Sequence, residues 1–250
     1  MRTESFKDFD DFASSIPGIE SKMLMRAPES RRWTIRRVTS GDIEIQLGEL
    51  GSGNIAAGAV RPDTFILYLP LTSGIEYLGN GERVGSQGCL LIEPGAEFCI
   101  STKQKHDWLA AFMPSRLLPA QLLDCFTRSC RVADVDGEVI EQFRTTLSEV
   151  LVASAAEEEF ESTRAVSNAA LEIQRLAARL SETDRQERRA NEGRPRMPRQ
   201  DIVRSALAFM ERCHDRPVHV ADLADACAVS ERTVRSVFHD FYGLSPVRYL

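Results

Sequence analysis

Two short helical patterns joined by a tight corner close this 250-residue chain, and they restrict its final domain more than any other feature does. Their apolar positions recur at the spacing of a buried helix face. These positions are Val220, Leu223, Ala224 and Cys227 in the first pattern and Val234, Val237, Phe238 and Phe241 in the second. Ala228 and Val229 form the corner, Ser230 is a good N-cap, and Gly243 suits a left-handed helix end. The spacing therefore predicts a helix-turn-helix.

The polar side of the second helix holds the candidate functional residues. They are Glu231, Arg232, Arg235, Ser236 and His239, followed by Asp240. Early residues of the second helix in such a motif meet base edges in the major groove, where Arg binds guanine O6 and N7 together. Charge alone favours ordinary solvated residues on an amphipathic helix. The turn between the helices favours DNA contact, with Arg232 and Arg235 reading bases.

The closing residues also resemble a known family. The matching positions are Leu223–Ala224, Val229–Val234, Val237–Phe238, Tyr242–Pro246 and Arg248–Leu250. Together they resemble the first helix-turn-helix of the AraC/XylS transcription regulators. The resemblance places base contacts on Arg232, Arg235 and Ser236, and it implies a linker helix beginning at Ser245–Pro246. Family members continue into a second helix-turn-helix that this chain does not contain, so we expect residues 200–250 to form a truncated DNA-binding domain.

The charge distribution predicts weak DNA binding by this chain alone. Its formal charge is −6, but residues 194–250 hold nine arginines against seven acidic residues, a net +2 that leaves −8 for the rest. So mild a basic bias predicts that DNA binding is weak and falls steeply as the salt concentration rises. Met1–Phe12 carries no secretory signal and no long apolar run follows, so we expect a cytoplasmic protein without membrane contact.

Short strands separated by glycine and proline corners fill residues 22–114 and predict an antiparallel barrel or jelly roll. The expected strands are Trp33–Val38, Ile43–Leu50, Ile55–Val60, Phe65–Leu71, Gly74–Leu78, Cys89–Ile92, Glu97–Ile100 and Trp108–Met113, with a tight hairpin at Gly79–Gly81. The segment resembles the cupin-type sensor domain of AraC-family regulators, with the best local match at Gly88–Gly95. Interior candidates for a ligand pocket are Trp33, Phe65, Tyr68, Tyr77, Phe98 and Trp108, although aromatic residues on barrel strands are usually core.

Metal-dependent chemistry is not expected from this barrel. His106 is the one histidine in the segment, too few for a three-ligand metal site, and its turn predicts a solvated side chain. The six cysteines form no Cys-x-x-Cys pair. We therefore predict no metal, no cofactor and no enzymatic activity.

Helical patterns follow Pro114. They span Leu117–Phe126, Val139–Leu151 and about Glu157–Leu180. The third carries an apolar stripe from Val166 to Leu180. This stripe could pair with a second copy of the chain or pack on its own barrel, and the sequence supports the two alternatives about equally. Residues 181–199 are polar and contain Gly193, Pro195 and Pro198, which predicts a linker whose arginines could reach DNA phosphates. A further helix is expected from Asp201.

These observations predict an α+β protein with a cupin-like sensor and dimerisation domain at 1–180, a linker at 181–199 and a helix-turn-helix domain at 200–250. The expected function is sequence-specific, DNA-binding transcription regulation, responsive to a small molecule, by a homodimer that could contact RNA polymerase. Two alternatives stay open: a truncated regulator that dimerises with intact partners, and a cupin-type enzyme, which the scarcity of metal ligands disfavours.

Overall fold

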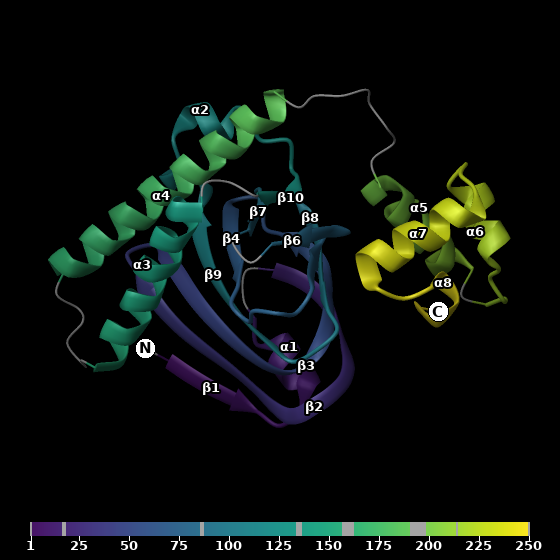
Figure 1. The fold of residues 1–250 in the computed structure, drawn as a ribbon, viewed down its shortest axis with the longest axis horizontal. Helices are drawn as coiled ribbons and strands as arrows, with labels where there is room; N and C mark the ends of the chain where they lie inside the picture. The colour runs from purple at the N-terminus through teal and green to yellow at the C-terminus, as the bar shows by residue number, and fades with distance from the viewer. Residues whose placement is uncertain are drawn as a thin grey trace.

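Ten strands form one antiparallel sheet that curls into a nearly closed barrel (Figure 1). The computed structural model describes residues 2–16, 19–85, 88–133, 137–156, 163–190, 199–213 and 215–249. The strands are β1 (Arg2–Phe6), β2 (Ile19–Ser40), β3 (Ile43–Val60), β4 (Thr64–Pro70), β5 (Tyr77–Gly79), β6 (Glu82–Val84), β7 (Cys89–Ile92), β8 (Glu97–Thr102), β9 (His106–Pro114) and β10 (Cys130–Ala133). Their order is β10-β7-β4-β9-β3-β8-β5-β6, with β2 between β1 and β3.

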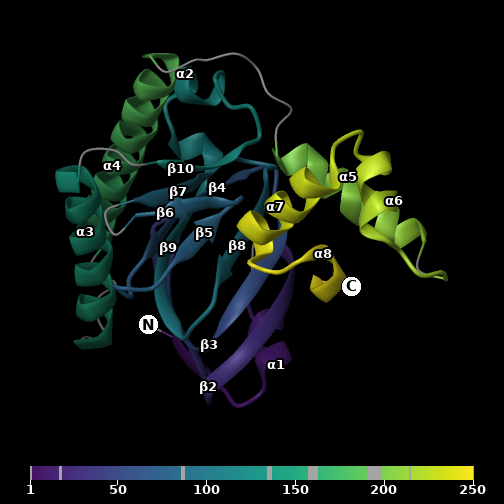
Figure 2. The same ribbon diagram turned by 45° about the vertical axis from the view of Figure 1, so that its right-hand side comes forward.

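The helices cover two sides of this barrel. They are α1 (Phe9–Ser14), α2 (Ala120–Leu123), α3 (Gly137–Ala156), α4 (Thr163–Ala190), α5 (Arg199–Arg212), α6 (Val220–Ala226), α7 (Glu231–Tyr242) and α8 (Pro246–Tyr249), with a 3-10 turn at Ser115–Leu117. Helices α3 and α4 pack on one side, and α5–α8 form a separate bundle that lies against β8 and β5 (Figure 2). The α+β class and the cupin-like barrel expected from the sequence are confirmed. No helix in the described ranges is long and apolar enough to cross a membrane.

Strand β3 joins the two halves of the barrel. It pairs with β9 through Glu44–Leu50 and with β8 through Ile55–Ala59. The sequence predicts a break at Gly51–Asn54, and this prediction is wrong because the strand runs through. A Cβ on Gly51 would lie 2.4 Å from the Ser30 carbonyl oxygen, and one on Gly53 2.5 Å from the Lys103 backbone. These glycines permit close backbone approach and do not form a turn.

The hairpin expected at Gly79–Gly81 is confirmed. Tyr77 pairs with Val84 and Gly79 with Glu82, which leaves Asn80 and Gly81 as a two-residue loop. Both have positive φ, 47° and 81°, as a type I′ turn requires. Strand β6 beyond this turn was not predicted, because its three residues are too few to show an alternating pattern.

The start of the chain differs from the helix suggested by its spaced phenylalanines. Residues Arg2–Phe6 pair with β2 as a strand, and α1 begins only at Phe9. The Asp8 carboxylate caps α1 by accepting from the Asp10 and Asp11 amides at 2.9 and 3.3 Å.

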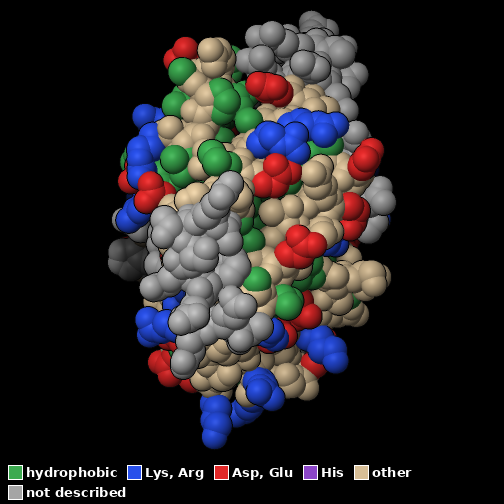
Figure 3. All heavy atoms as spheres, turned by 90° about the vertical axis from the view of Figure 1, so that its left-hand side faces the viewer, with side chains coloured by type: hydrophobic (Ala, Val, Ile, Leu, Met, Phe, Trp, Pro, Cys, Tyr) green, Lys and Arg blue, Asp and Glu red, His purple; other side chains and the backbone are tan. Residues whose placement is uncertain are grey.

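The apolar stripe of α4 faces its own barrel. Ile173, Leu176, Ala177 and Leu180 are fully buried in one core with Phe143 of α3 and residues of β4 and β9. Of the two alternatives that the sequence leaves open, the stripe therefore packs on its own barrel, and these four side chains are not available to pair with a second chain. The side chain of Val166 lies outside the described residues. Val152 of α3 and Leu171 of α4 are exposed. The side of the molecule drawn in Figure 3 shows hydrophobic side chains among charged ones.

Helix α4 also corrects the expected start of the linker. The sequence places a linker at residues 181–199, yet α4 continues to Ala190. Ser181 and Asp184 are buried, and Asp184 binds Arg131 of β10, so contacts with the barrel extend the helix. Residues 191–198 lie outside the described residues, and α5 begins at Arg199.

Candidate nucleic-acid interface

Local hydrogen bonds build the two helices at the end of the chain as the sequence predicts. The His219 amide donates to the Asp222 carboxylate at 2.9 Å at the start of α6. Ala228 has a φ of 53°, and the Val229 amide bonds the Ala224 carbonyl at 3.0 Å, which closes α6 and turns the chain. Ser230 Oγ then accepts from the Thr233 amide at 3.1 Å, and Gly243 ends α7 with a φ of 60°.

An apolar core holds these helices at a fixed angle. Val234, Val237, Phe238 and Phe241 of α7 are all buried, as predicted. They pack with Leu223 of α6, with Cys227 at its C-terminal end, and with Ile202, Ala206 and Met210 of α5. The ring centroid of Tyr249 in α8 lies 4.5 Å from the ring centroid of Tyr242 and 5.7 Å from that of Phe238. We call this bundle, Arg199–Tyr249, the reading unit.

The side of α7 opposite this core exposes every residue predicted to contact DNA. Glu231, Arg232, Arg235, Ser236 and His239 form this surface, which we call the reading edge. Arg232 has no hydrogen-bond or ion-pair partner in the part of the chain that the structure describes. Arg235 pairs with Glu231 at 2.7 Å, one helical turn away, and both side chains are about half exposed. An exposed pair of this kind contributes little stability, so Arg235 can exchange Glu231 for another acceptor at small cost.

Arg199 and Asp240 complete the reading edge. Arg199 of α5 donates to Asp240 and to Ser236 Oγ, the second at 3.1 Å, and Ser236 Oγ lies 3.3 Å from the Asp240 carboxylate. Arg199 thus offsets the negative charge of Asp240 and orients the Ser236 hydroxyl. The four-residue spacing of Ser236 and Asp240 is visible in the sequence, but the approach of Arg199 depends on how α5 packs. The other arginines expected to reach phosphates from the linker, Arg188, Arg189, Arg194 and Arg196, have side chains outside the described residues.

The barrel interior holds a small apolar cavity of about 50 Å³. Tyr68, Phe98 and Trp108, three of the predicted pocket candidates, line it together with Phe12 and Ile16 near α1. Of the other candidates, Trp33 and Tyr77 are buried in the same interior core, while Phe65 faces α3 and α4. Asn54 and His106 supply polar groups to an otherwise apolar lining.

His106 is buried, which corrects the expectation of a solvated loop residue. It is 3% exposed, its Nδ1 lies 3.0 Å from both Thr102 Oγ1 and the Gln104 carbonyl, and its ring packs edge-on against Tyr77. Burial lowers the pKa of His106 to about 4, so the imidazole is neutral at neutral pH. The polar residues around it suggest a turn in the sequence, but His106 already belongs to β9.

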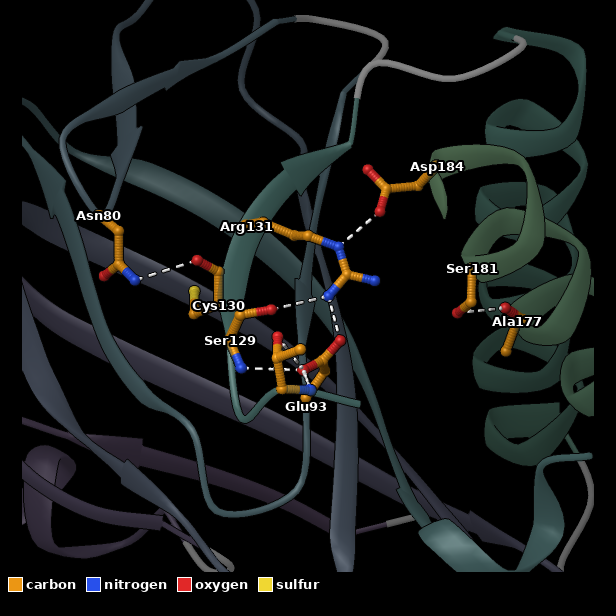
Figure 4. Close-up of polar contacts among 9 residues, drawn as sticks. Asn80, Glu93, Ser129, Cys130, Arg131, Ala177, Ser181 and Asp184 are labelled. Carbon is orange, nitrogen blue, oxygen red and sulfur yellow. Dashed lines mark hydrogen bonds and ion pairs between the residues drawn. The ribbon is translucent and has the colours of Figure 1, made fainter. Parts of the chain in front are cut away.

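A buried ion cluster joins the barrel to α4 (Figure 4). Arg131 of β10 binds Glu93 and Asp184, and all three side chains are at most 11% exposed. The second oxygen of Glu93 accepts from the Thr127 and Ser129 amides at 2.8 and 2.9 Å. Each charged group in the cluster therefore has an ionic or hydrogen-bonding partner, as burial requires. Nothing in the sequence pairs these three residues, which lie 38 and 53 positions apart.

Comparison with known proteins supports this architecture at the level of the fold. No family model and no curated protein matches the sequence. The AraC-like transcriptional activator CuxR aligns over 95% of this chain and 89% of its own, with a TM-score of 0.52 at 10% identity. ToxT from Vibrio cholerae covers 93% of this chain and 97% of its own at 8% identity, with a TM-score of 0.28 that is too low to support an argument. The chain therefore shares its fold with an AraC-like transcriptional activator, as the resemblance in its closing residues predicts.

Proposed function

We propose that this chain is a sequence-specific DNA-binding regulator of transcription. The observation that carries the proposal is the exposed reading edge on a well-packed helix-turn-helix. Among the described residues Arg232 has no partner, and Arg235 is held by one exposed ion pair. A helix placed in the major groove by such a motif presents its early side chains to base edges. Arg232 and Arg235 would bind guanine, Ser236 would add a further contact, and Glu231 and His239 would flank them.

Selection from a random duplex library tests this function. The full chain, immobilised at low salt, should enrich a short common motif. Arg232→Ala should lose the preference at particular base pairs, while Arg83→Ala, which removes an exposed arginine from the barrel, should keep the motif. Failure of the wild-type chain to enrich any motif above background would contradict the proposal.

We further propose that the barrel cavity receives a small-molecule effector. Its lining is mostly apolar, with hydrogen-bonding groups from Asn54 and His106, which suits a compact apolar molecule bearing one polar group. Phenol should therefore raise the melting temperature of the protein more than benzene does, and Asn54→Leu should remove the difference. Equal shifts from both compounds, or none from either, would argue against this pocket.

A cupin-type enzyme is the competing reading, and the ligand chemistry disfavours it. Within the ranges that the structure covers, no three His, Cys, Asp or Glu side chains gather as a metal-binding group. His106 already has two hydrogen-bond partners and is buried. Metal analysis of the purified protein discriminates the two readings, since an enzyme of that kind would retain about one ion per chain.

We propose that the regulator acts in the cytoplasm as a homodimer and contacts RNA polymerase once on DNA. The inner stripe of α4 is buried, so we assign the pairing to the outward face of α3 and α4, where Val152 and Leu171 are exposed. Light scattering of the wild type and of Leu171→Glu tests it: a dimer that persists unchanged in the variant would exclude this face.

A further inference from the structure

Strand β8 has two faces that serve two different parts of the molecule. Phe98 and Ile100 line the barrel cavity, while Cys99 between them belongs to the core of the reading unit. Strand β3 repeats the pattern, because Ala56 lines the cavity and its neighbour Ile55 packs with the reading unit. Successive side chains of a strand point to opposite faces. One layer of backbone therefore separates the cavity from the reading unit.

The reading unit is attached to this wall at the end of α7. The Cys99 thiol donates to the Phe241 carbonyl, with Sγ 3.7 Å from the oxygen, and Arg26 of β2 donates to the Tyr242 carbonyl. The last carbonyls of a helix have no partner within the helix, and a cation near them is favourable. Barrel side chains thus supply the hydrogen bonds that complete the recognition helix, at the end remote from Arg232.

Further contacts make this junction close and specific. Gly81 lies against Phe241, and a Cβ on Gly81 would come within 2.7 Å of the Phe241 ring. Glu97 of β8 pairs with Arg204 of α5 at 3.0 Å, and its carbonyl accepts from Gln200 at 3.2 Å. Alternate residues of β8, Glu97 and Cys99, therefore face the reading unit, while Phe98 faces the cavity.

The Asn80 side chain adds a connection between this wall and β10. Asn80 Oδ1 accepts from the Cys99 amide at 2.7 Å, and Asn80 Nδ2 donates to the Cys130 carbonyl at 3.1 Å (Figure 4). Cys130 precedes Arg131, whose guanidinium holds Asp184 of α4. The position of β8 is thus tied to β10 and, through it, to the helix that leads toward the reading unit.

The size of the cavity gives the wall a mechanical role. At about 50 Å³ it is far smaller than typical ligand pockets of 300 Å³ or more, so an occupant of several atoms has to displace the side chains that line it. Packed interiors resist compression and shift between discrete arrangements. Outward displacement of Phe98 or Ile100 moves β8, which carries Cys99 and its contact with α7.

We propose that β8 and β3 form a transmitting wall, through which occupancy of the cavity changes the docking of the reading unit at Arg26 and Cys99. The inference rests on the proposed effector pocket and specifies how that pocket regulates. The two states are a reading unit docked on the barrel, as here, and one released from it. An occupant shifts the balance only by as much as it favours one state over the other.

Hydrogen exchange of the full chain without DNA tests both parts of this mechanism. Arg26→Met removes the cap but keeps the side-chain length, and it should speed exchange in residues 237–244 roughly tenfold. Ala56→Met fills the cavity from the shared wall and should alter exchange in the same residues about fivefold or more. Ala110→Met is the matched control, since it fills the same cavity from β9. It should change the exchange rates of residues 237–244 less than Ala56→Met does.

The possible outcomes are distinct. Unchanged exchange in Arg26→Met would show that the reading unit is not held by this contact. If Arg26→Met changes hydrogen exchange in residues 237–244 but Ala56→Met does not, the reading unit is docked at Arg26 but does not respond to the cavity. This result, like unchanged exchange in Arg26→Met, overturns the proposal. If Ala56→Met fails to give a cooperative unfolding transition, Ile100→Phe, with its smaller volume change on β8, takes its place. A motif enriched by DNA selection with no coupling in exchange would refute the wall and leave the proposed DNA-binding function intact.

Discussion

Arg26, on the second strand of the barrel, donates a hydrogen bond to the carbonyl of Tyr242, the last residue of α7, 216 positions further along the chain. The contact joins the two parts of the molecule that the sequence assigns to different tasks. It leaves Arg232 and Arg235 exposed, so the docked reading unit still presents its reading edge. Docking therefore orients this surface without covering it.

Arg232 and Arg235 should discriminate between bases. Replacing either with Ala should cost about 1 to 3 kcal/mol at particular base pairs, because a bidentate contact with guanine is lost. Titration of the selected motif and of its single-base variants measures the effect. A loss of equal size on every sequence would instead identify a phosphate contact.

The N-cap of the recognition helix should contribute measurably to stability. Ser230→Ala removes the acceptor for the Thr233 amide and should lower the free energy of unfolding by about 1 kcal/mol in a urea titration. Ser205→Ala, at an exposed position within α5, is the control and should change it by less than about 0.5 kcal/mol. Equal effects of the two substitutions would mean that the cap does not stabilise α7.

The buried cluster around Arg131 should be far more sensitive to substitution than a surface pair. Arg131→Met leaves Glu93 and Asp184 buried without their cation, which should cost about 3 to 5 kcal/mol. Arg116→Met breaks a 2.6 Å pair with Asp42 in which both side chains are about 60% exposed, so its cost should stay below about 1 kcal/mol. Chemical denaturation compares the free energies of unfolding of the two variants. Similar losses of stability would show that burial does not make the Arg131 cluster more sensitive than a surface pair.

Stability should fall in mild acid because of His106. Burial lowers its pKa from 6.5 to about 4, so between these values the unfolded chain binds the proton more readily than the folded one. The stabilisation is fully present above pH 6.5 and is lost as the pH falls toward 4, by about 3 kcal/mol in total. His106→Gln should flatten this part of the stability profile, whereas the exposed His239→Gln should not. Parallel profiles for wild type and His106→Gln between pH 7 and 4.5 would refute the assignment.

The reading unit was predicted almost completely because its signals are local. Ser230 caps a helix that begins one residue later, Gly243 ends it, and the apolar positions between them recur at helical spacing. The Asn80–Gly81 hairpin was predictable for the same reason, since positive φ is needed at two adjacent positions. The glycines at 51 and 53 misled the prediction, because a glycine for close packing and a glycine for a turn look alike in sequence.

The sequence by itself determined the barrel, helix α7 and the residues of its exposed edge, since hydrophobic period, caps and turn residues act over a few positions. Only the tertiary structure decided which way the α4 stripe faces, that His106 is buried, that Arg131 holds Glu93 and Asp184, and that Arg199 and Arg26 bind α7. Each of these depends on side chains far apart in the chain meeting in space, where burial removes water and makes a specific partner necessary. No local pattern encodes such a meeting.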